Sequence, residues 1–296
     1  MKLHPTELFA CLAFFACAMP AHAASNACDP LPAPTLYEIQ VPFEVIDGRI
    51  YIDARVNDRG PFRFAVDTGA SDFGRADTSL VKALGLKLDA PTLNSDGLMT
   101  SAVDTTHLTS LRVGNLRRKN LQVITRDYSS KMKPEAALSG IIARDFFADG
   151  LLIIDYPNKR LSFSRTLSLK PDSPGSLPYN KPFRVPVRIG QVTVEGNLDT
   201  GANVSFVLPQ TLFERVGGKD PVRAEAGTLA NTKVDTARAT LGGPFVLGTV
   251  QLTDQEVRVS EKYPELLVGA HALQHFEVLI DQRSKRVAVC APESAQ

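Results

Sequence analysis

Short runs in which apolar residues occupy every second position recur along the chain. They begin near Phe62, Leu121, Val192 and Val257. A period of two is expected of half-buried β-strands. Turn sequences such as Asp47-Gly48 and the Leu-Gly-Gly-Pro stretch at 241–244 separate the runs. The pattern therefore predicts an all-β protein with a few short helices, which we expect at 79–84, 143–147 and 270–276.

The pattern also repeats at long range. Phe64–Ser71 (FAVDTGAS) recurs as Gly196–Asn203 (GNLDTGAN), an apolar strand that runs into Asp-Thr-Gly-Ala in both cases. Later apolar segments that end in Asp155 and Asp281 repeat in the same order. Self-similarity of this kind decides the architecture before any single element does. We therefore expect two equivalent lobes.

Two segments rich in proline mark the boundaries of the lobes. Residues 170–182 are too rich in proline and glycine for the interior of a strand and form the expected linker. We assign 37–169 to an N-terminal lobe and 183–296 to a C-terminal lobe. Residues 24–36 contain a proline-rich stretch and are expected to form an extended arm.

Residues 1–23 resemble a secretory signal peptide. Lys2 precedes an apolar run from Leu8 to Ala18, and Ala21-His22-Ala23 has the small-x-small form of a cleavage site. The run is too short to span a bilayer, so no stable membrane anchor is expected. The cysteines within it lack the arrangement of a lipoprotein signal. The prediction is a periplasmic or secreted protein.

Cleavage would leave Cys28 and Cys290, one at each end of the mature chain. Two cysteines in an oxidising compartment favour a disulfide bond. Two unpaired thiols are the alternative that the sequence leaves open.

The charge excludes one class of partner. The formal net charge is +1, and the basic residues form no stripe along the chain. Nucleic-acid binding is therefore not expected.

The repeated aspartates, Asp67 and Asp199, carry the chemistry. One carboxyl group cannot serve as base and acid in a single step, whereas two that share a proton can. Two carboxyl groups about 3 Å apart cannot both ionise, so the pair holds one proton over a broad acidic range. Turn-initiating aspartates are the structural alternative, and the repetition argues against it.

These residues resemble the retropepsin-like aspartic proteases, in the tandem form in which one chain supplies both lobes, as in pepsin. The resemblance extends to a second motif, an apolar-apolar-Gly segment, at Gly140–Phe147 and Leu266–Leu273. Ala143 stands where the resemblance implies glycine, whereas Gly269 keeps it. The resemblance implies a bilobal pepsin-like fold, a peptide or protein substrate, and no metal or cofactor.

The resemblance also implies roles for the residues beside each aspartate. Glycine lets the backbone approach the carboxyl groups, threonine bonds across the lobes, and a polar side chain two residues later bonds the outer carboxylate oxygen. The residues in question are Thr68, Gly69, Ser71, Thr200, Gly201 and Asn203. Flap hairpins are expected with tips at 95–97 and 226–228.

Other candidate sites are weaker. His271 and His275 share an expected helix face but lack a third metal ligand. Asp155 and Asp281 end buried strands, so capping or structural pairing is favoured over catalysis.

The sequence thus predicts an exported aspartic endopeptidase that acts as a monomer, because one chain supplies both aspartates. A catalytically idle peptide-binding module and a processing protease selective for one exported partner remain as alternatives.

Overall fold

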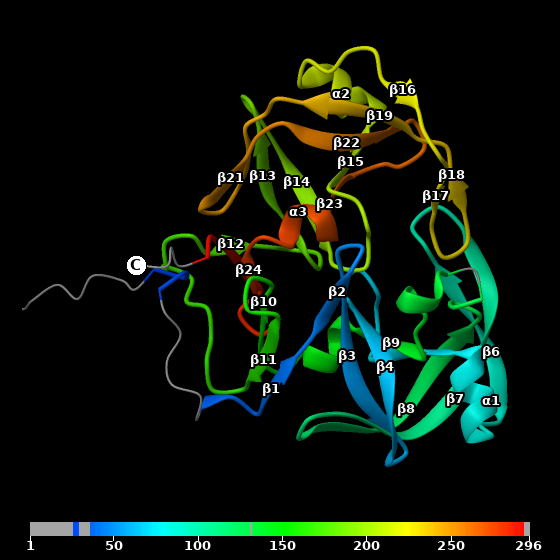
Figure 1. Ribbon diagram of the computed structural model, residues 1–296. Coiled ribbons are helices and arrows are strands. Elements are labelled where there is room, and N and C mark those ends of the chain that lie inside the picture. Colours follow the sequence, from blue (N-terminus) through cyan, green and yellow to red (C-terminus); the bar gives the residue numbers. More distant parts are fainter. Residues whose placement is uncertain (1–25, 30–35, 131, 293–296) are drawn as a thin grey trace, which may run out of the picture.

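The computed structural model describes residues 26–29, 36–130 and 132–292. The predicted signal peptide lies outside these residues, as does most of the proline-rich arm. Within the described part the chain is mostly β-strand, and its strands form two sheet-rich lobes, one at the top and one at the lower right of Figure 1. The prediction of an all-β, bilobal fold is confirmed.

An eight-stranded sheet forms lobe one. Its strands, in spatial order, are β2 (Glu44–Ile46), β3 (Arg49–Val56), β4 (Arg59–Asp67), β9 (Gly140–Ala143), β5 (Gly74–Asp77), β8 (Leu116–Arg126), β7 (Thr100–Val113) and β6 (Leu88–Ser95). Strand β3 also pairs with β7, which curls the sheet upon itself. The alternation predicted for β4 is lost at its end, where Phe64, Ala65 and Val66 are all buried because both faces of the strand are covered there.

A nine-stranded sheet forms lobe two. Its strands, in spatial order, are β16 (Val222–Arg223), β19 (Ala237–Leu241), β22 (Gln255–Ser260), β15 (Phe206–Pro209), β23 (Leu266–Gly269), β14 (Val192–Asp199), β13 (Arg184–Ile189), β20 (Phe245–Leu247) and β21 (Val250–Leu252). A separate hairpin is formed by β17 (Gly227–Thr228) and β18 (Lys233–Val234).

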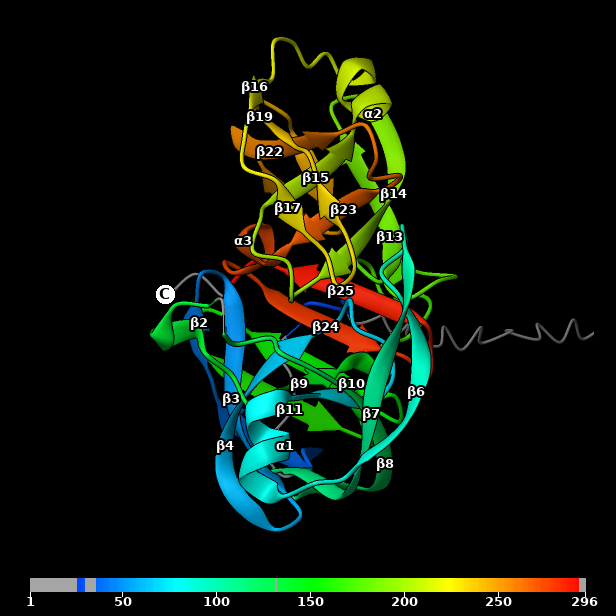
Figure 2. The same ribbon diagram turned by 90° about the vertical axis from the view of Figure 1, so that its right-hand side faces the viewer.

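A third sheet, with six strands, is shared by the two lobes (Figure 2). Its order is β1 (Ile39–Pro42), β11 (Arg160–Ser164), β10 (Leu151–Asp155), β24 (Glu277–Asp281), β25 (Arg286–Cys290) and β12 (Leu177–Pro178). Strands β10 and β24 pair antiparallel, with Leu152 opposite Ile280, and so join the lobes by backbone hydrogen bonds. Strand β12 lies within the predicted linker, which therefore contributes a short edge strand.

The helices are few and short. Helix α1 (Thr78–Leu84) is capped by Asp77, whose Oδ1 accepts a hydrogen bond from the Ser79 amide at 2.9 Å. The second expected helix is a 3₁₀ turn at Arg144–Phe147, and the third is α3 (Ala270–Leu273). Helix α2 (Gln210–Arg215) was not predicted.

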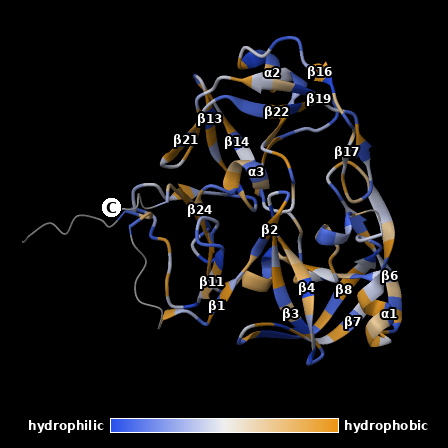
Figure 3. Cartoon of the chain, viewed as in Figure 1, coloured by the Kyte–Doolittle hydropathy of each residue, from blue (hydrophilic) through white to orange (hydrophobic). Residues whose placement is uncertain are grey.

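One continuous hydrophobic core runs through both lobes. It includes Phe64 and Phe163 on one side and Phe206 on the other. Figure 3 shows hydrophobic segments distributed over the strands of all three sheets. Burial of this surface is the main favourable contribution to folding. Among the described helices, none has the length and apolar character needed to cross a bilayer.

Cys28 and Cys290 form a disulfide bond with their Cα atoms 5.4 Å apart. The predicted pairing is confirmed, and the alternative of two free thiols is excluded. The disulfide bond attaches the segment at 26–29 to β25 of the shared sheet.

Candidate active site

Each Asp-Thr-Gly loop begins where a central strand ends. Asp67 is the last residue of β4, and Asp199 is the last residue of β14. Each strand pairs in parallel with the strand of the second motif, which places Asp67 opposite Ala143 and Asp199 opposite Gly269. Both loops are therefore held at the edge of their lobe by the same local topology.

The two threonines lock the loops together. The Thr68 amide donates to Thr200 Oγ1 at 3.1 Å, and the Thr200 amide donates to Thr68 Oγ1 at 3.0 Å. Each hydroxyl donates in turn to a carbonyl of the opposite strand, Leu198 O at 3.2 Å and Val66 O at 2.9 Å. Both threonines are buried, so these reciprocal bonds exclude water and fix the loops relative to each other.

The glycines permit a close approach of each loop to the opposite carboxyl group. A Cβ atom on Gly69 would lie 2.5 Å from the carboxyl carbon of Asp199. A Cβ atom on Gly201 would lie 2.4 Å from that of Asp67. Any larger residue would collide with the facing aspartate. The structure thus brings Asp67 and Asp199 together, and we call them the aspartate pair.

The backbone also supplies hydrogen bonds to the pair. The Ala70 amide donates to Asp67 Oδ1 at 2.9 Å, and the Gly201 amide donates to Asp199 Oδ1 at 2.8 Å. The pKa of Asp199 is nevertheless raised well above its usual range, first by burial and then by the negative charge of Asp67. A hydrogen bond with Asp67 acts in the same direction. The pair is therefore expected to retain one proton at pH values where isolated aspartates are ionised.

Comparison with known protein families agrees with this geometry. The family model described as aspartyl protease matches the chain twice, over residues 52–146 and 185–272. The two matches together cover more than half of the chain, and each contains one Asp-Thr-Gly loop. The chain belongs to the aspartyl protease family. A search of curated proteins finds no match.

The polar residues that follow the loops of this aspartyl protease differ from expectation. The Ser71 hydroxyl donates to Asp72 Oδ2 at 3.4 Å and accepts from Arg75 Nη2 at 3.3 Å. Asn203 donates through Nδ2 to Asp47 Oδ2 at 2.5 Å. These side chains thus use their hydrogen bonds on neighbours of the loops rather than on the outer carboxylate oxygens.

Arg49, which the sequence did not single out, belongs to this site. From the start of β3 in lobe one it reaches across to the second loop, donating through Nε to Gly201 O at 2.7 Å. Its Nη2 donates to Asn203 Oδ1 at 2.9 Å. The positive charge of Arg49 lowers the pKa of Asp199, although less than burial and Asp67 raise it.

The turn that precedes Arg49 is also seated on lobe two. Asp47 Oδ1 lies 3.1 Å from His271 Nε2 on α3. A Cβ atom on Gly48 would lie 2.4 Å from the His271 ring, so only glycine fits against this ring. The sequence favoured a satisfied or solvated helix face over a metal site for His271, and its ring nitrogen is satisfied by Asp47 across the contact between the lobes.

Two flap hairpins extend from the lobes. The first is formed by β6 and β7, and its turn contains the predicted tip at 95–97. The second is formed by β17 and β18, with its turn at 229–232, three residues beyond the predicted tip at 226–228. The two hairpins approach each other at the right of Figure 1.

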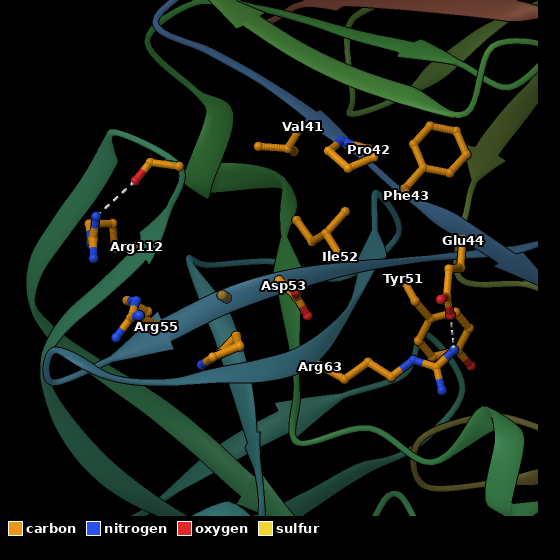
Figure 4. A pocket seen from close by; sticks show the side chains of 13 residues that line it. Val41, Pro42, Phe43, Glu44, Tyr51, Ile52, Asp53, Arg55, Arg63 and Arg112 are labelled. Carbon is orange, nitrogen blue, oxygen red and sulfur yellow. Dashed lines mark hydrogen bonds and ion pairs between the residues drawn. The ribbon is translucent and has the colours of Figure 1, made fainter.

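A hollow of about 650 Å³ lies elsewhere, on the outside of lobe one (Figure 4). Its walls include Tyr51 and Asp53 of β3, and Arg63, which forms an ion pair with Glu44 at 2.7 Å. No residue of either Asp-Thr-Gly loop lines it. This hollow is therefore not the site of the aspartate pair.

Proposed function

We propose that the protein is an exported aspartic endopeptidase in which Asp67 and Asp199 activate water for attack on a peptide bond. One observation carries the proposal: the threonines hold two Asp-Thr-Gly loops face to face, so that each glycine contacts the opposite carboxyl group. This arrangement suits acid–base chemistry, because both carboxyl groups can reach one water molecule.

The surroundings of the pair suggest how the roles divide. Asp199 keeps its proton because burial and the charge of Asp67 raise its pKa. In the proposed reaction ionised Asp67 takes a proton from the water, and protonated Asp199 donates a hydrogen bond to the scissile carbonyl oxygen. The water oxygen then bonds to the carbonyl carbon, giving a tetrahedral intermediate that is not covalently attached to the protein. Asp67 then transfers the proton that it took from the water to the amide nitrogen. The carbon–nitrogen bond breaks as the carbonyl re-forms, which releases an amine fragment and a carboxylic acid fragment and leaves Asp67 ionised and Asp199 protonated.

Export to the periplasm or outside the cell is part of the proposal. The Cys28–Cys290 bond supports it, since disulfides persist in oxidising compartments. The proposal treats the protein as active as a monomer, because a single chain contributes both aspartates.

The test is cleavage of a mixed peptide library by the mature chain between pH 3 and pH 8, with and without a statine-type inhibitor. Asp67→Asn and Asp199→Asn should each reduce cleavage by about 10²-fold to 10⁴-fold or more, the range for loss of one acid–base group. Asp53→Asn, at an exposed position of β3, is the matched control and should retain full activity. Full activity in either folded variant of the pair would refute the proposal.

A further inference from the structure

Asn231 of lobe two makes most of the hydrogen bonds that join the two flap hairpins. Asn231 lies in the turn between β17 and β18, and its amide donates to Asp96 Oδ2 of the first flap hairpin at 2.7 Å. Its side-chain Nδ2 donates to two backbone carbonyls of that hairpin, Asn94 O at 2.8 Å and Met99 O at 2.9 Å. These contacts connect residues more than 130 positions apart in the chain.

The side-chain oxygen of Asn231 is used as fully as the nitrogen. Oδ1 accepts from Ser101 Oγ at 2.7 Å and from Arg126 Nη2 at 2.7 Å. Arg126 also donates through Nη1 to Ala230 O at 2.6 Å. A carboxamide has two donor hydrogens and two acceptor lone pairs, so the side chain of Asn231 satisfies its complete hydrogen-bonding capacity on lobe one.

Asp96, which accepts the hydrogen bond from the Asn231 amide, is held in its charged form. Burial acts to raise the pKa of Asp96, but hydrogen bonds from the Met99, Asn231 and Leu98 amides and from the Thr232 side chain together outweigh burial and lower that pKa. Asp96 therefore remains an acceptor through mildly acidic conditions, and the contact between the hairpins persists there.

This contact is linked to the aspartate pair electrostatically through Tyr128. Burial raises the pKa of Tyr128, which follows β8, and the charges of Arg126 and Asp67 act on it in opposite directions. The lobes are joined by the threonines beside the pair, by the contacts of Asp47 and Arg49 with lobe two, and by the two hairpins. Figure 2 shows the first flap hairpin rising along lobe one toward lobe two.

We propose that Asn231 is a specificity-determining latch, which holds the flap hairpins closed so that the protein prefers polypeptide segments with a free end over closed loops. This inference rests on the proposed function. A linear chain can pass end-first between the threonines and the hairpins. A loop whose two ends are held elsewhere reaches the aspartate pair only after every hydrogen bond of the latch has broken.

The test compares a linear peptide with the head-to-tail cyclic peptide of the same sequence. For Asn231→Ala, the ratio of kcat/KM on the cyclic peptide to kcat/KM on the linear one should rise at least tenfold. Ser101→Ala, which removes one donor to Asn231 Oδ1, should raise the ratio by a smaller factor. Asn115→Ala, in an exposed turn of lobe one, is the matched control and should leave the ratio unchanged. An unchanged ratio in Asn231→Ala, or an equal loss on both peptides, would overturn the proposal.

A second measurement separates this inference from the proposed function. Amide hydrogen exchange in residues 94–101 and 229–232 should be at least tenfold faster in Asn231→Ala than in the parent or in Asn115→Ala. If the parent cleaves neither peptide, the proposed function fails, and exchange rates alone decide whether the latch exists. Equal exchange in the parent and in Asn231→Ala would show that Asn231 does not close the hairpins.

Discussion

The two Asp-Thr-Gly loops share four consecutive residues but differ in what surrounds them. Each loop is supported within its own lobe by an equivalent bond, from the Arg144 amide to Ala70 O at 3.2 Å and from the Ala270 amide to Ala202 O at 2.8 Å. The loop at Asp199 receives an additional cation from the other lobe, because Arg49 binds its backbone at Gly201. A repeated sequence has therefore produced two carboxyl groups in unequal electrostatic environments.

This inequality explains how identical residues can take different parts in one reaction. The pKa of Asp199 is raised, and the cation of Arg49 limits the rise. Pairs of titratable groups whose environments separate their pKa values are a common basis for acid and base roles. The difference between the lobes can be tested in four comparisons.

The largest effect on stability is expected at the aspartates that end β10 and β24. Asp281 is completely buried and accepts hydrogen bonds from the Leu169 amide at 3.1 Å and from Arg283 Nε at 3.2 Å. Asp281→Ala should lower the free energy of unfolding by about 3 to 5 kcal/mol, because it leaves buried donors unpaired. Asp155→Ala, whose carboxylate bonds only nearby residues such as Asn158, should cost about 1 kcal/mol. Urea denaturation of both variants checks this, and equal losses would contradict it.

The second comparison concerns the residue opposite each aspartate. A Cβ atom on Gly269 would lie 2.2 Å from Val204 O, whereas lobe one already accommodates Ala143 at the matching position. Gly269→Ala should therefore destabilise the protein by about 1 to 3 kcal/mol through overpacking. Ala143→Gly should cost only about 0.5 to 1 kcal/mol, through greater backbone freedom of the unfolded chain. In thermal unfolding, Gly269→Ala should lower the Tm more than Ala143→Gly does. A larger decrease in Ala143→Gly would contradict this comparison of the two positions.

The third comparison uses the pH dependence of stability. Because the pKa of Asp199 is raised in the folded protein, the folded state holds a proton that the unfolded chain releases above about pH 4. Stability from this group is therefore present at low pH and is lost as pH rises through the raised pKa. Asparagine does not ionise, so Asp199→Asn does not lose stability in this way. The Tm of Asp199→Asn minus the Tm of the parent should therefore be more positive at pH 9 than at pH 4. Exposed Asp53→Asn should show no such dependence, and a pH-independent gain in Asp199→Asn would argue against the raised pKa.

The smallest effect is expected from Arg49. Removing its charge in Arg49→Met should raise the pKa of Asp199 further, so protonated Asp199 would persist to higher pH. The alkaline limb of the kcat/KM profile should then move upward by about one pH unit or less. Arg49→Lys keeps the charge and should leave the limb in place while reducing the rate. A downward shift in Arg49→Met would contradict the role assigned to Arg49.

Much of the fold and the centre of the site could be predicted from the sequence because their signals are local. The strands that carry Asp67 and Asp199 follow a period of two, and the Asp-Thr-Gly loops repeat in full. Helix α2 was missed because it is short and has no side-chain cap at Pro209. Strand β12 was missed because it is only two residues long and forms by pairing with β25.

The contacts between the lobes were not predictable for a different reason. Arg49 bonds a residue 152 positions away, and Ser101 bonds Asn231 across 130 positions. Nothing in the residues around Arg49 or Asn231 distinguishes them from surface arginines and turn asparagines. Their roles depend on contacts that exist only when the two lobes lie against each other.

The disulfide bond between Cys28 and Cys290 makes nearly the whole described chain a closed covalent ring. A single cut in any loop between these residues therefore releases no fragment, and the two pieces remain one molecule until the bond is reduced. The proposed function would expose each molecule to nicking by other copies of the protein in solution. This ring allows it to survive one such nick with both halves still attached.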